Sequence, residues 1–290
     1  IQNNNEFFIF DLPKLRKEIK KKKKIGRPAH IHLEIETGGN RTGLPVKKLT
    51  QAITLIRKNK QHVKFTGLCT HLAGAETLAN KFRIVRQIQE FDRVADRFKK
   101  RRTRPQLMHM ANSSAALSLP KTTRDLVRFG VSAYGFWPSP DIHNLHLMRV
   151  NKTRDNPLKR VLTWKTNVMH IKSVKQDEFI GYGTSYQAAH NMKVAVIPVG
   201  YANGYPREMS NKGHVLIRGK KARITGLINM NLFMVDITKI PGAKIGDEVM
   251  LIGRQNNNAI TVSSFSEFSS ALNTEFLSRL PTTIPRSIGR

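Results

Sequence analysis

Cysteine and long apolar runs are both nearly absent from this chain. Cys69 is the only cysteine among 290 residues, which excludes an intrachain disulfide framework and a zinc site built from cysteines. Apolar runs such as 194–199 are far shorter than the ~20 residues that span a bilayer. The first residues also lack the basic segment, apolar core and cleavage site of a signal peptide. We therefore expect a reduced, soluble, cytoplasmic protein that does not engage a membrane.

Acidic side chains are scarce as well. The chain has 20 Asp and Glu against 50 Lys and Arg, a net charge of +30. Such a surplus attracts polyanions, because bound phosphates release their counterions. However, the densest run, Lys20–Lys24 followed by Arg27, ends a helical pattern, where cations suit the helix C-terminus. No nucleic-acid-binding motif accompanies it, so we expect loose electrostatic contacts and no specific nucleic acid; a basic nucleic-acid-binding protein is the less favoured alternative.

Residues 1–157 alternate between strand and helix patterns. Their order predicts a parallel sheet with crossover helices. A length of 290 residues corresponds to about two domains at ~150 residues each. The expected strands are 7–10, 30–36, 63–70, 106–110 and 126–132, and the expected helices are 12–23, 46–59, 80–99 and 114–118.

The expected strand 30–36 carries polar side chains on one face. His30, His32, Glu34 and Glu36 alternate with apolar residues. A polar inner face is typical of a strand at the mouth of a catalytic α/β barrel rather than in a doubly wound sheet. The same four residues could be metal ligands, but one strand spreads them over about 20 Å. We therefore expect no metal site.

Residues 158–290 change to short β-type segments separated by Gly and Pro, as in a small β-barrel or sandwich. We expect the linker at 152–158, which contains Pro157. We therefore predict two domains, a partial α/β barrel over 1–157 and a mainly β domain over 158–290. The expected strands of the second domain are 165–174, 193–198, 214–218, 223–227, 233–237 and 248–252.

Polar groups follow four successive strands of the first domain. These groups are Arg41 and its neighbours, His71, Asn112–Ser114, and Arg128 with Gly130. Because functional side chains gather at the carboxyl ends of barrel strands, four such positions with two arginines indicate an anion site. Each residue also has a structural interpretation: a helix cap, a surface ion pair or a packed histidine.

Eight motifs follow one another along the chain between residues 32 and 253. In this order they resemble the alanine racemases, enzymes with a PLP-binding α/β barrel and a β-rich C-terminal domain. The resemblance implies an incomplete (β/α)8 TIM-type barrel followed by a mainly β domain. The motifs are HLEIETGGNRTGL (His32–Leu44), GLCTHLAGA (Gly67–Ala75), HMANSSAAL (His109–Leu117), VRFGVSAYG (Val127–Gly135), GYGTSYQA (Gly181–Ala188), PVGYANGYPR (Pro198–Arg207), GLINMNLFMVDIT (Gly226–Thr238) and KIGDEVMLIG (Lys244–Gly253).

The resemblance implies interconversion of L- and D-alanine through an aldimine of pyridoxal 5'-phosphate (PLP), which supplies D-alanine for peptidoglycan. By the same resemblance, Tyr186 would be the base that takes the proton from L-alanine, and His71 would hydrogen-bond to it. Arg128 would meet the pyridine nitrogen, where a guanidinium that keeps its proton disfavours a protonated ring.

The remaining implied roles concern binding. Arg41 would contact the cofactor's phenolic oxygen or the substrate carboxylate, which Met230 would bind through its backbone N–H. Tyr201 would line the substrate entrance. The family forms homodimers whose sites join one subunit's barrel to the other's C-terminal domain, so Tyr186 and Met230 would act across the interface. The phosphate would be held by Ser113, Gly130 and Val131.

The chain also departs from the family pattern. No Val-Lys-Ala-Asn-Ala-Tyr-Gly-like motif, which carries the PLP-anchoring lysine, is present. We therefore expect a racemase that lacks the N-terminal part of its barrel and has little or no activity alone. The alternative is a non-catalytic racemase-like protein that holds PLP or an amino acid. Among smaller changes, Glu34 stands where some members carry a carbamylated lysine and would orient Arg41, while Thr274 and Asn203 replace a tyrosine and an aspartate.

Overall fold

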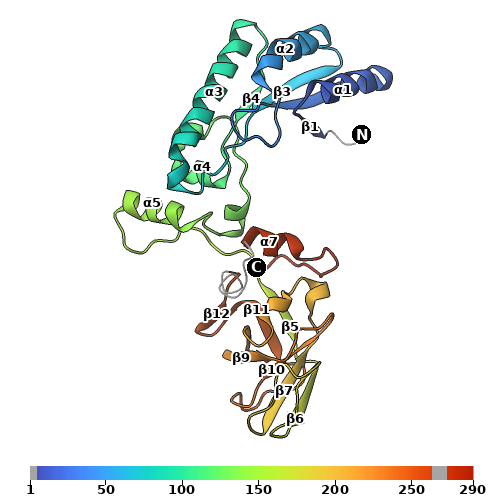
Figure 1. The fold of residues 1–290 in the computed structure, drawn as a ribbon, viewed down its shortest axis with the longest axis vertical. Coiled ribbons are helices and arrows are strands. Elements are labelled where there is room, and N and C mark those ends of the chain that lie inside the picture. Colours follow the sequence, from blue (N-terminus) through green and yellow to red (C-terminus); the bar gives the residue numbers. More distant parts are fainter. Residues whose placement is uncertain (1–4, 263–272, 290) are drawn as a thin grey trace. The chain divides into compact units, whose positions relative to one another are not determined.

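The computed structural model describes residues 5–262 and 273–289. The chain divides into two compact units, Ile1–Lys159 and Arg160–Arg290 (Figure 1). This division lies two residues beyond the expected boundary at 157/158. Each unit is described by itself.

The first unit is built on a four-stranded parallel sheet in the order β1-β2-β3-β4. A helix follows each of the first three strands, so each connection crosses over to the next parallel strand. This arrangement confirms the predicted α/β class with its incomplete barrel. The strands are β1 (Glu6–Ile9), β2 (Ala29–Glu34), β3 (Val63–Cys69) and β4 (Leu107–His109), and the crossover helices are α1 (Leu12–Ile25), α2 (Leu49–Lys58) and α3 (Lys81–Lys100).

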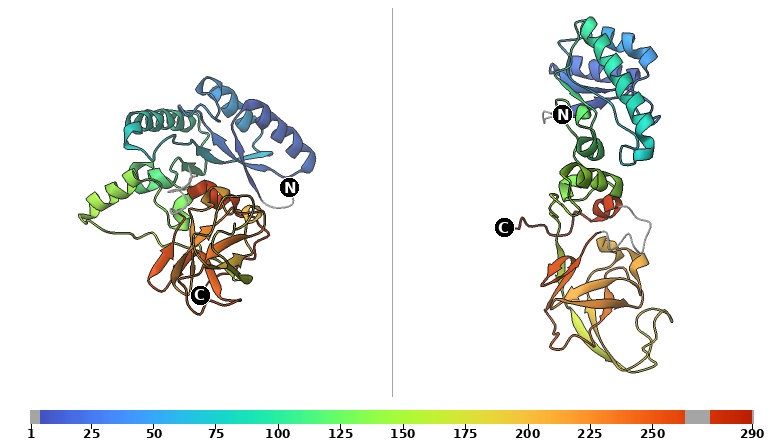
Figure 2. Two further views of the ribbon diagram at one scale, coloured as in Figure 1. Left: turned by 60° about the horizontal axis from the view of Figure 1, so that its bottom comes forward. Right: turned by 90° about the vertical axis from the view of Figure 1, so that its left-hand side faces the viewer.

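The two faces of this sheet differ in polarity. Ile31 and Leu33 are fully buried in one core cluster with residues of all three helices, which lie beside the sheet in Figure 2. The alternate residues of β2, His30 and His32, point to the other face, where they contact Glu6. The strand period of two therefore separates the core from the polar groups.

Local sequence explains where α1 begins and ends. The Asp11 side chain accepts a hydrogen bond from the Lys14 N–H (2.6 Å), and Pro13 occupies the first turn, as is favourable at helix starts. Gly26 ends the helix in the left-handed conformation at φ 73°. The basic run Lys20–Lys24 therefore lies in the C-terminal part of α1, where cations interact favourably with the helix dipole.

The sequence prediction of a strand over 126–132 is wrong. Only Arg128 pairs, in an isolated bridge with Asn112, and Val131–Tyr134 forms a 3-10 turn. Val127 and Phe129 are partly exposed, so the apolar residues that suggested a strand are not packed as one. The chain then forms α5 (Pro140–Val150), a helix that was not predicted.

The second unit is an antiparallel sheet, which confirms the expected mainly β domain. Its strand order is β12-β11-β8-β9-β10-β7-β6, with β5 also paired to β11. The expected strand 165–174 is two strands, and β12 and the helix α7 (Asn273–Arg279) were not predicted. The strands are β5 (Trp164–Asn167), β6 (His170–Val174), β7 (Met192–Ile197), β8 (His214–Ile217), β9 (Lys220–Thr225), β10 (Phe233–Asp236), β11 (Glu248–Gln255) and β12 (Asn258–Ile260).

Short 3-10 turns and one further helix complete both units. In the first unit they are Val46–Lys48, Leu78–Asn80, α4 (Ser113–Ser118) and Pro120–Thr122, and in the second they are Tyr201–Asn203 and Arg207–Met209. Within the described ranges, no helix has the length and apolarity needed to cross a membrane.

Two phenylalanines on α3 provide a test of the packing. Phe91 is 1% exposed, and Phe82, which lies about half a turn away around the helix, is 73% exposed. We expect Phe91→Ala to lower the free energy of unfolding of the first unit by about 3–5 kcal/mol, because it leaves a core cavity. Phe82→Ala, the matched control, should leave it within about 0.5 kcal/mol. The measurement is the urea dependence of amide exchange in β2 and β3; equal effects of the two substitutions would contradict the packing.

Candidate active site

A cavity of about 270 Å³ lies in the first unit, beside residues that follow β2 and β3. Its size is near the lower end of small-molecule pockets. Arg41 and His71, both predicted site residues, line it together with Asn112. The carboxyl ends of these parallel strands therefore form a shared site, as expected for a barrel.

The loop that carries Arg41 is held by Glu36. The Glu36 carboxylate accepts hydrogen bonds from the backbone N–H groups of Gly38 (2.5 Å), Gly39 (2.7 Å) and Asn40 (2.9 Å). Glu34 accepts from the Thr42 hydroxyl (2.9 Å). In the described part of the chain Glu34 forms no ion pair with Arg41, so the expected orientation of Arg41 by Glu34 is not seen.

Gln87, which was not predicted as a site residue, is hydrogen-bonded to the backbone at His71 and Ala73. Gln87 on α3 is buried; its amide donates to the His71 carbonyl (3.1 Å) and accepts from the Ala73 N–H (2.9 Å). Its signal in the sequence is a polar residue among the core positions of α3. Burial, and then the positive charges of Arg41 and Arg128, lower the pKa of His71 below its usual value. The His71 side chain is therefore favoured in its neutral form.

The Arg128 guanidinium is fixed by three acceptors. Its Nη1 donates to Nδ1 of His109 (2.5 Å), and its Nη2 donates to the carbonyls of Thr70 (2.8 Å) and Met110 (3.2 Å). Two residues further along, the Gly130 N–H donates to the Ser113 hydroxyl oxygen (2.9 Å). The predicted phosphate residues Gly130 and Val131 thus follow shortly after Arg128 in the chain, and Ser113 is hydrogen-bonded to Gly130, although none of the three lines the cavity.

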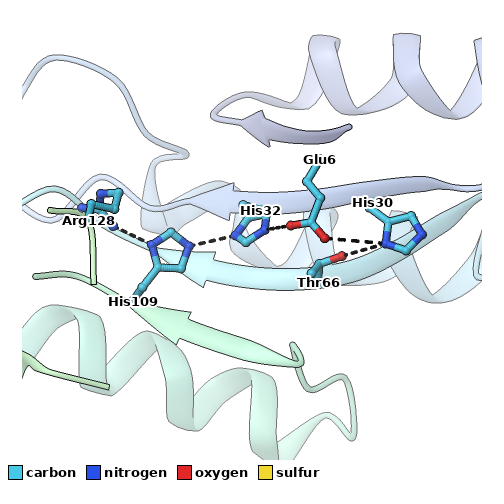
Figure 3. Close-up of polar contacts among 6 residues, drawn as sticks. All are labelled: Glu6, His30, His32, Thr66, His109 and Arg128. Atoms are coloured by element: carbon cyan, nitrogen blue, oxygen red, sulfur yellow. Dashed lines mark hydrogen bonds and ion pairs between the residues drawn. The ribbon is translucent and has the colours of Figure 1, made fainter. Parts of the chain in front are cut away.

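A row of polar contacts continues from Arg128 along the sheet (Figure 3). Nε2 of His109 lies 2.8 Å from Nδ1 of His32, and Nε2 of His32 lies 2.5 Å from the Glu6 carboxylate. Burial, and then Arg128 and His32, lower the pKa of His109 to about 4. His109 and Glu6 were not predicted as site residues, and His32 was considered only as a metal ligand. Among the residues that the structure describes, no three His, Cys, Asp or Glu side chains are grouped to hold a metal.

The second unit has its own cavity, of about 560 Å³. Tyr201 and Met230, two predicted site residues, line it with Arg207, which was not predicted. Gly200 allows the backbone of this turn to lie close to residues 229 and 230. A Cβ at position 200 would lie 2.2 Å from the Asn229 carbonyl oxygen and 2.3 Å from that of Met230. The side chain of Asn203 accepts a hydrogen bond from the Gly200 N–H (3.0 Å), which closes the turn.

Tyr186 is half-buried and packs against an apolar cluster of the second unit. This cluster consists of Val174, Ile180, Ala188, Met192, Val194 and Met234. Its carbonyl accepts from the Ile180 N–H (2.9 Å), but it does not line the cavity of Tyr201 and Met230. Thr274 is exposed on α7. Each unit therefore presents part of the predicted set of site residues.

Two family descriptions match this chain. They are "Alanine racemase, N-terminal domain" over residues 1–138 and "Alanine racemase, C-terminal domain" over residues 161–288. The alanine racemase of Clostridium novyi is 32% identical over 288 residues, which is 99% of this chain and 72% of the relative. A solved alanine racemase from Streptomyces coelicolor is 26% identical with a TM-score of 0.85, over 98% of this chain and 72% of that chain.

This chain belongs to the alanine racemase family. The alanine racemase of Halothermothrix orenii is 36% identical over 258 residues, 88% of this chain. The chain spans 64% of that relative's length and 65% of the alanine racemase of Leptospira interrogans. The resemblance drawn from eight motifs is therefore confirmed at the level of the family and its fold.

Gly200 tests how the second cavity of this racemase-family chain is built. We expect Gly200→Ala to push the backbone at Asn229 and Met230 away, because a Cβ does not fit. The expected result is a lower melting temperature and altered amide shifts at residues 228–232. Gly183→Ala, at a position with no atom within 4 Å of the added Cβ, is the comparison for space, although its φ of 66° adds strain. Unchanged shifts at 228–232 in Gly200→Ala would contradict the close approach.

The lowered pKa of His109 predicts a pH dependence of stability. Between about pH 6.5 and pH 4 the unfolded chain binds a proton at His109 that the folded chain does not. The free energy of unfolding of the first unit should therefore fall as the pH falls through this window. His109→Gln should flatten this slope, whereas His62→Gln, at a half-exposed loop position, should not. Urea unfolding at several pH values measures it, and an unchanged slope in His109→Gln would contradict the assignment.

Proposed function

We propose that this chain supplies cofactor- and substrate-contacting residues of a PLP-dependent alanine racemase, which interconverts L- and D-alanine. The observation that carries the proposal is the Arg128 guanidinium, held on three acceptors, in the same segment as the Ser113–Gly130 contact. We further propose that the enzyme is a cytoplasmic homodimer with shared sites, and that its D-alanine is used for peptidoglycan.

The donor groups of the first unit fit PLP. A guanidinium has five N–H donors, and the Nε–H of Arg128 has no partner among the described residues. It can therefore donate to an acceptor such as a pyridine nitrogen. The Ser113 hydroxyl already accepts from the Gly130 N–H, so its own proton is free for a phosphate oxygen. Arg128 would hold the ring, and Ser113, Gly130 and Val131 would hold the phosphate.

Covalent attachment of PLP is not supported by this chain. None of the described residues that line the first cavity is a lysine, and the sequence has no anchoring-lysine motif. Noncovalent contacts alone remain, so we propose that this polypeptide binds PLP reversibly and has little or no racemase activity by itself.

The chain's own residues have separate roles in the proposed reaction. When bound, PLP supplies an electron sink for negative charge at the alanine Cα. Tyr186 would accept the Cα proton of L-alanine, and His71, favoured as neutral by its lowered pKa, would hydrogen-bond to the phenol. Arg41 and the Met230 N–H would bind the substrate carboxylate, because both are donors suited to an anion. Tyr201 would restrict the entrance.

PLP binding is the first test. We expect reversible binding, measured by equilibrium dialysis, that weakens at least about tenfold in Arg128→Leu, since a hydrogen bond to a charged group is lost. Arg124→Leu is the control, because Arg124 pairs with Asp92 on the surface (2.9 Å). Borohydride should leave no pyridoxyl group on a single lysine. Equal binding by both variants, or one stoichiometric pyridoxyl-lysine, would contradict the proposal.

Hydrogen exchange at Cα separates a racemase site from a binding protein. In D2O with PLP added, we expect the chain to catalyse deuterium uptake at Cα of L-alanine more than of D-alanine, with little racemisation. Tyr186→Phe should reduce the exchange about 100-fold, the size of a general-base contribution, and Tyr134→Phe should not. Binding of PLP without any exchange would instead favour a non-catalytic PLP-binding protein.

A further inference from the structure

We propose that Glu6 is a positioning residue for Arg128 and acts through His32 and His109. The contacts themselves are a property of this chain; their effect on PLP rests on the proposed function. Glu6 comes from β1, His32 from β2 and His109 from β4 (Figure 3), so three separate strands contribute to one row of contacts.

The contacts form a continuous row between two charged groups. Glu6 Oε2 to His32 Nε2 is 2.5 Å, His32 Nδ1 to His109 Nε2 is 2.8 Å, and His109 Nδ1 to Arg128 Nη1 is 2.5 Å. His32 and His109 are buried, whereas Glu6 is half-exposed. Each ring nitrogen of the two histidines therefore has one partner.

The two ends of the row determine its direction. Arg128 can only donate, so Nδ1 of His109 accepts, and in the neutral ring Nε2 then carries the proton. That proton is donated to Nδ1 of His32, which leaves the His32 proton on Nε2. A carboxylate can only accept, and Glu6 provides that acceptor. A donor at position 6 would move the proton of each histidine to Nδ1. The Nδ1–H of His109 and the Nη1–H of Arg128 would then face each other with no acceptor between them.

The sheet is shaped to admit the His32 ring. The pairing of β2 with β3 shifts register at this point, where Ile31 pairs with Phe65 but His32 pairs with Gly67. A Cβ at Gly67 would lie 2.0 Å from Nδ1 of His32. The irregular register redirects the His32 side chain, and Gly67 opposite it has no side chain that would collide with the ring. Such bulges are common beside functional sites. Phe8 covers the two rings, with centroids at 5.5 and 6.1 Å.

Glu6 has further neighbours that restrict it. Its other oxygen lies 3.9 Å from Nδ1 of His30, which the Thr66 hydroxyl also approaches (3.4 Å). The row thus ends in the Glu6 carboxylate, which contacts two histidines, and in the Arg128 guanidinium, which has three acceptors. Glu6 and Arg128 thus favour the same tautomers of the two histidines, and the Glu6 acceptor helps to keep the Arg128 guanidinium in the orientation that these tautomers accept.

Nitrogen-15 NMR of the imidazoles, on the chain without PLP, tests this directly. We expect His32 and His109 to carry their protons on Nε2 in the native chain. Glu6→Leu removes the acceptor and leaves the Arg128 donor as the only end of the row that favours these tautomers. We expect the guanidinium then to turn away from His109 part of the time, which gives mixed tautomers at both rings and a shifted or broadened Arg128 Nε–H signal. Glu6→Gln keeps an acceptor oxygen and should preserve the native signals. Glu18→Leu, which makes the same change on α1, should have no effect.

A second variant and a second readout separate the possible failures. Gly67→Ala should displace the His32 ring and give the same mixed tautomers with Glu6 intact. PLP affinity should fall roughly tenfold in Glu6→Leu, the lower end of the loss seen when a partner hydrogen-bonded to a metal ligand is removed, and recover in Glu6→Gln. Unchanged tautomers in Glu6→Leu, or a proton on Nδ1 of His109, would overturn the inference even if PLP binds. If the native chain binds no PLP, the proposed function fails, and the tautomers still decide the role of Glu6.

Discussion

The site depends on how the segment after β4 is tied back to the sheet. Arg128 donates to the carbonyls of Thr70 and Met110 and to the ring of His109, and the bridge to Asn112 lies at the same place. These contacts replace the strand pairing that 126–132 lacks. Because they hold the half-buried Arg128 guanidinium on three acceptors, they also fix where its remaining N–H groups point, Nε–H among them, and with them the proposed cofactor contact.

The sequence predicted the strand and helix order of the first unit well, because its elements have clear periods and caps. Asp11, Pro13 and Gly26 determine α1 through local chemistry alone. On α3, Phe82 is exposed because it lies about half a turn around the helix from Phe91, whereas Gln87 shares the buried face with Phe91 and its amide binds the His71 loop. Hydrogen bonding of the helix to a loop is a tertiary effect that helical periodicity does not contain.

The candidate residues show the same division. Arg41 and His71 could be predicted because each follows a strand, and the structure brings them to one cavity. His109 and Glu6 could not, since their importance depends on register across β1, β2 and β4. A strand pattern predicts which face a side chain occupies, but the bulge at His32 and the space above Gly67 come from pairing between strands far apart in sequence.

The central claim is that Arg128 and the Ser113–Gly130 pair form one PLP-binding surface. A crystal structure of the chain grown with PLP tests this most directly. The account predicts the pyridine nitrogen within hydrogen-bond distance of the Arg128 guanidinium, and the phosphate against the Ser113 hydroxyl and the Gly130 and Val131 N–H groups. PLP located elsewhere, for example on the exposed lysines of α1, with Arg128 unchanged, would contradict it.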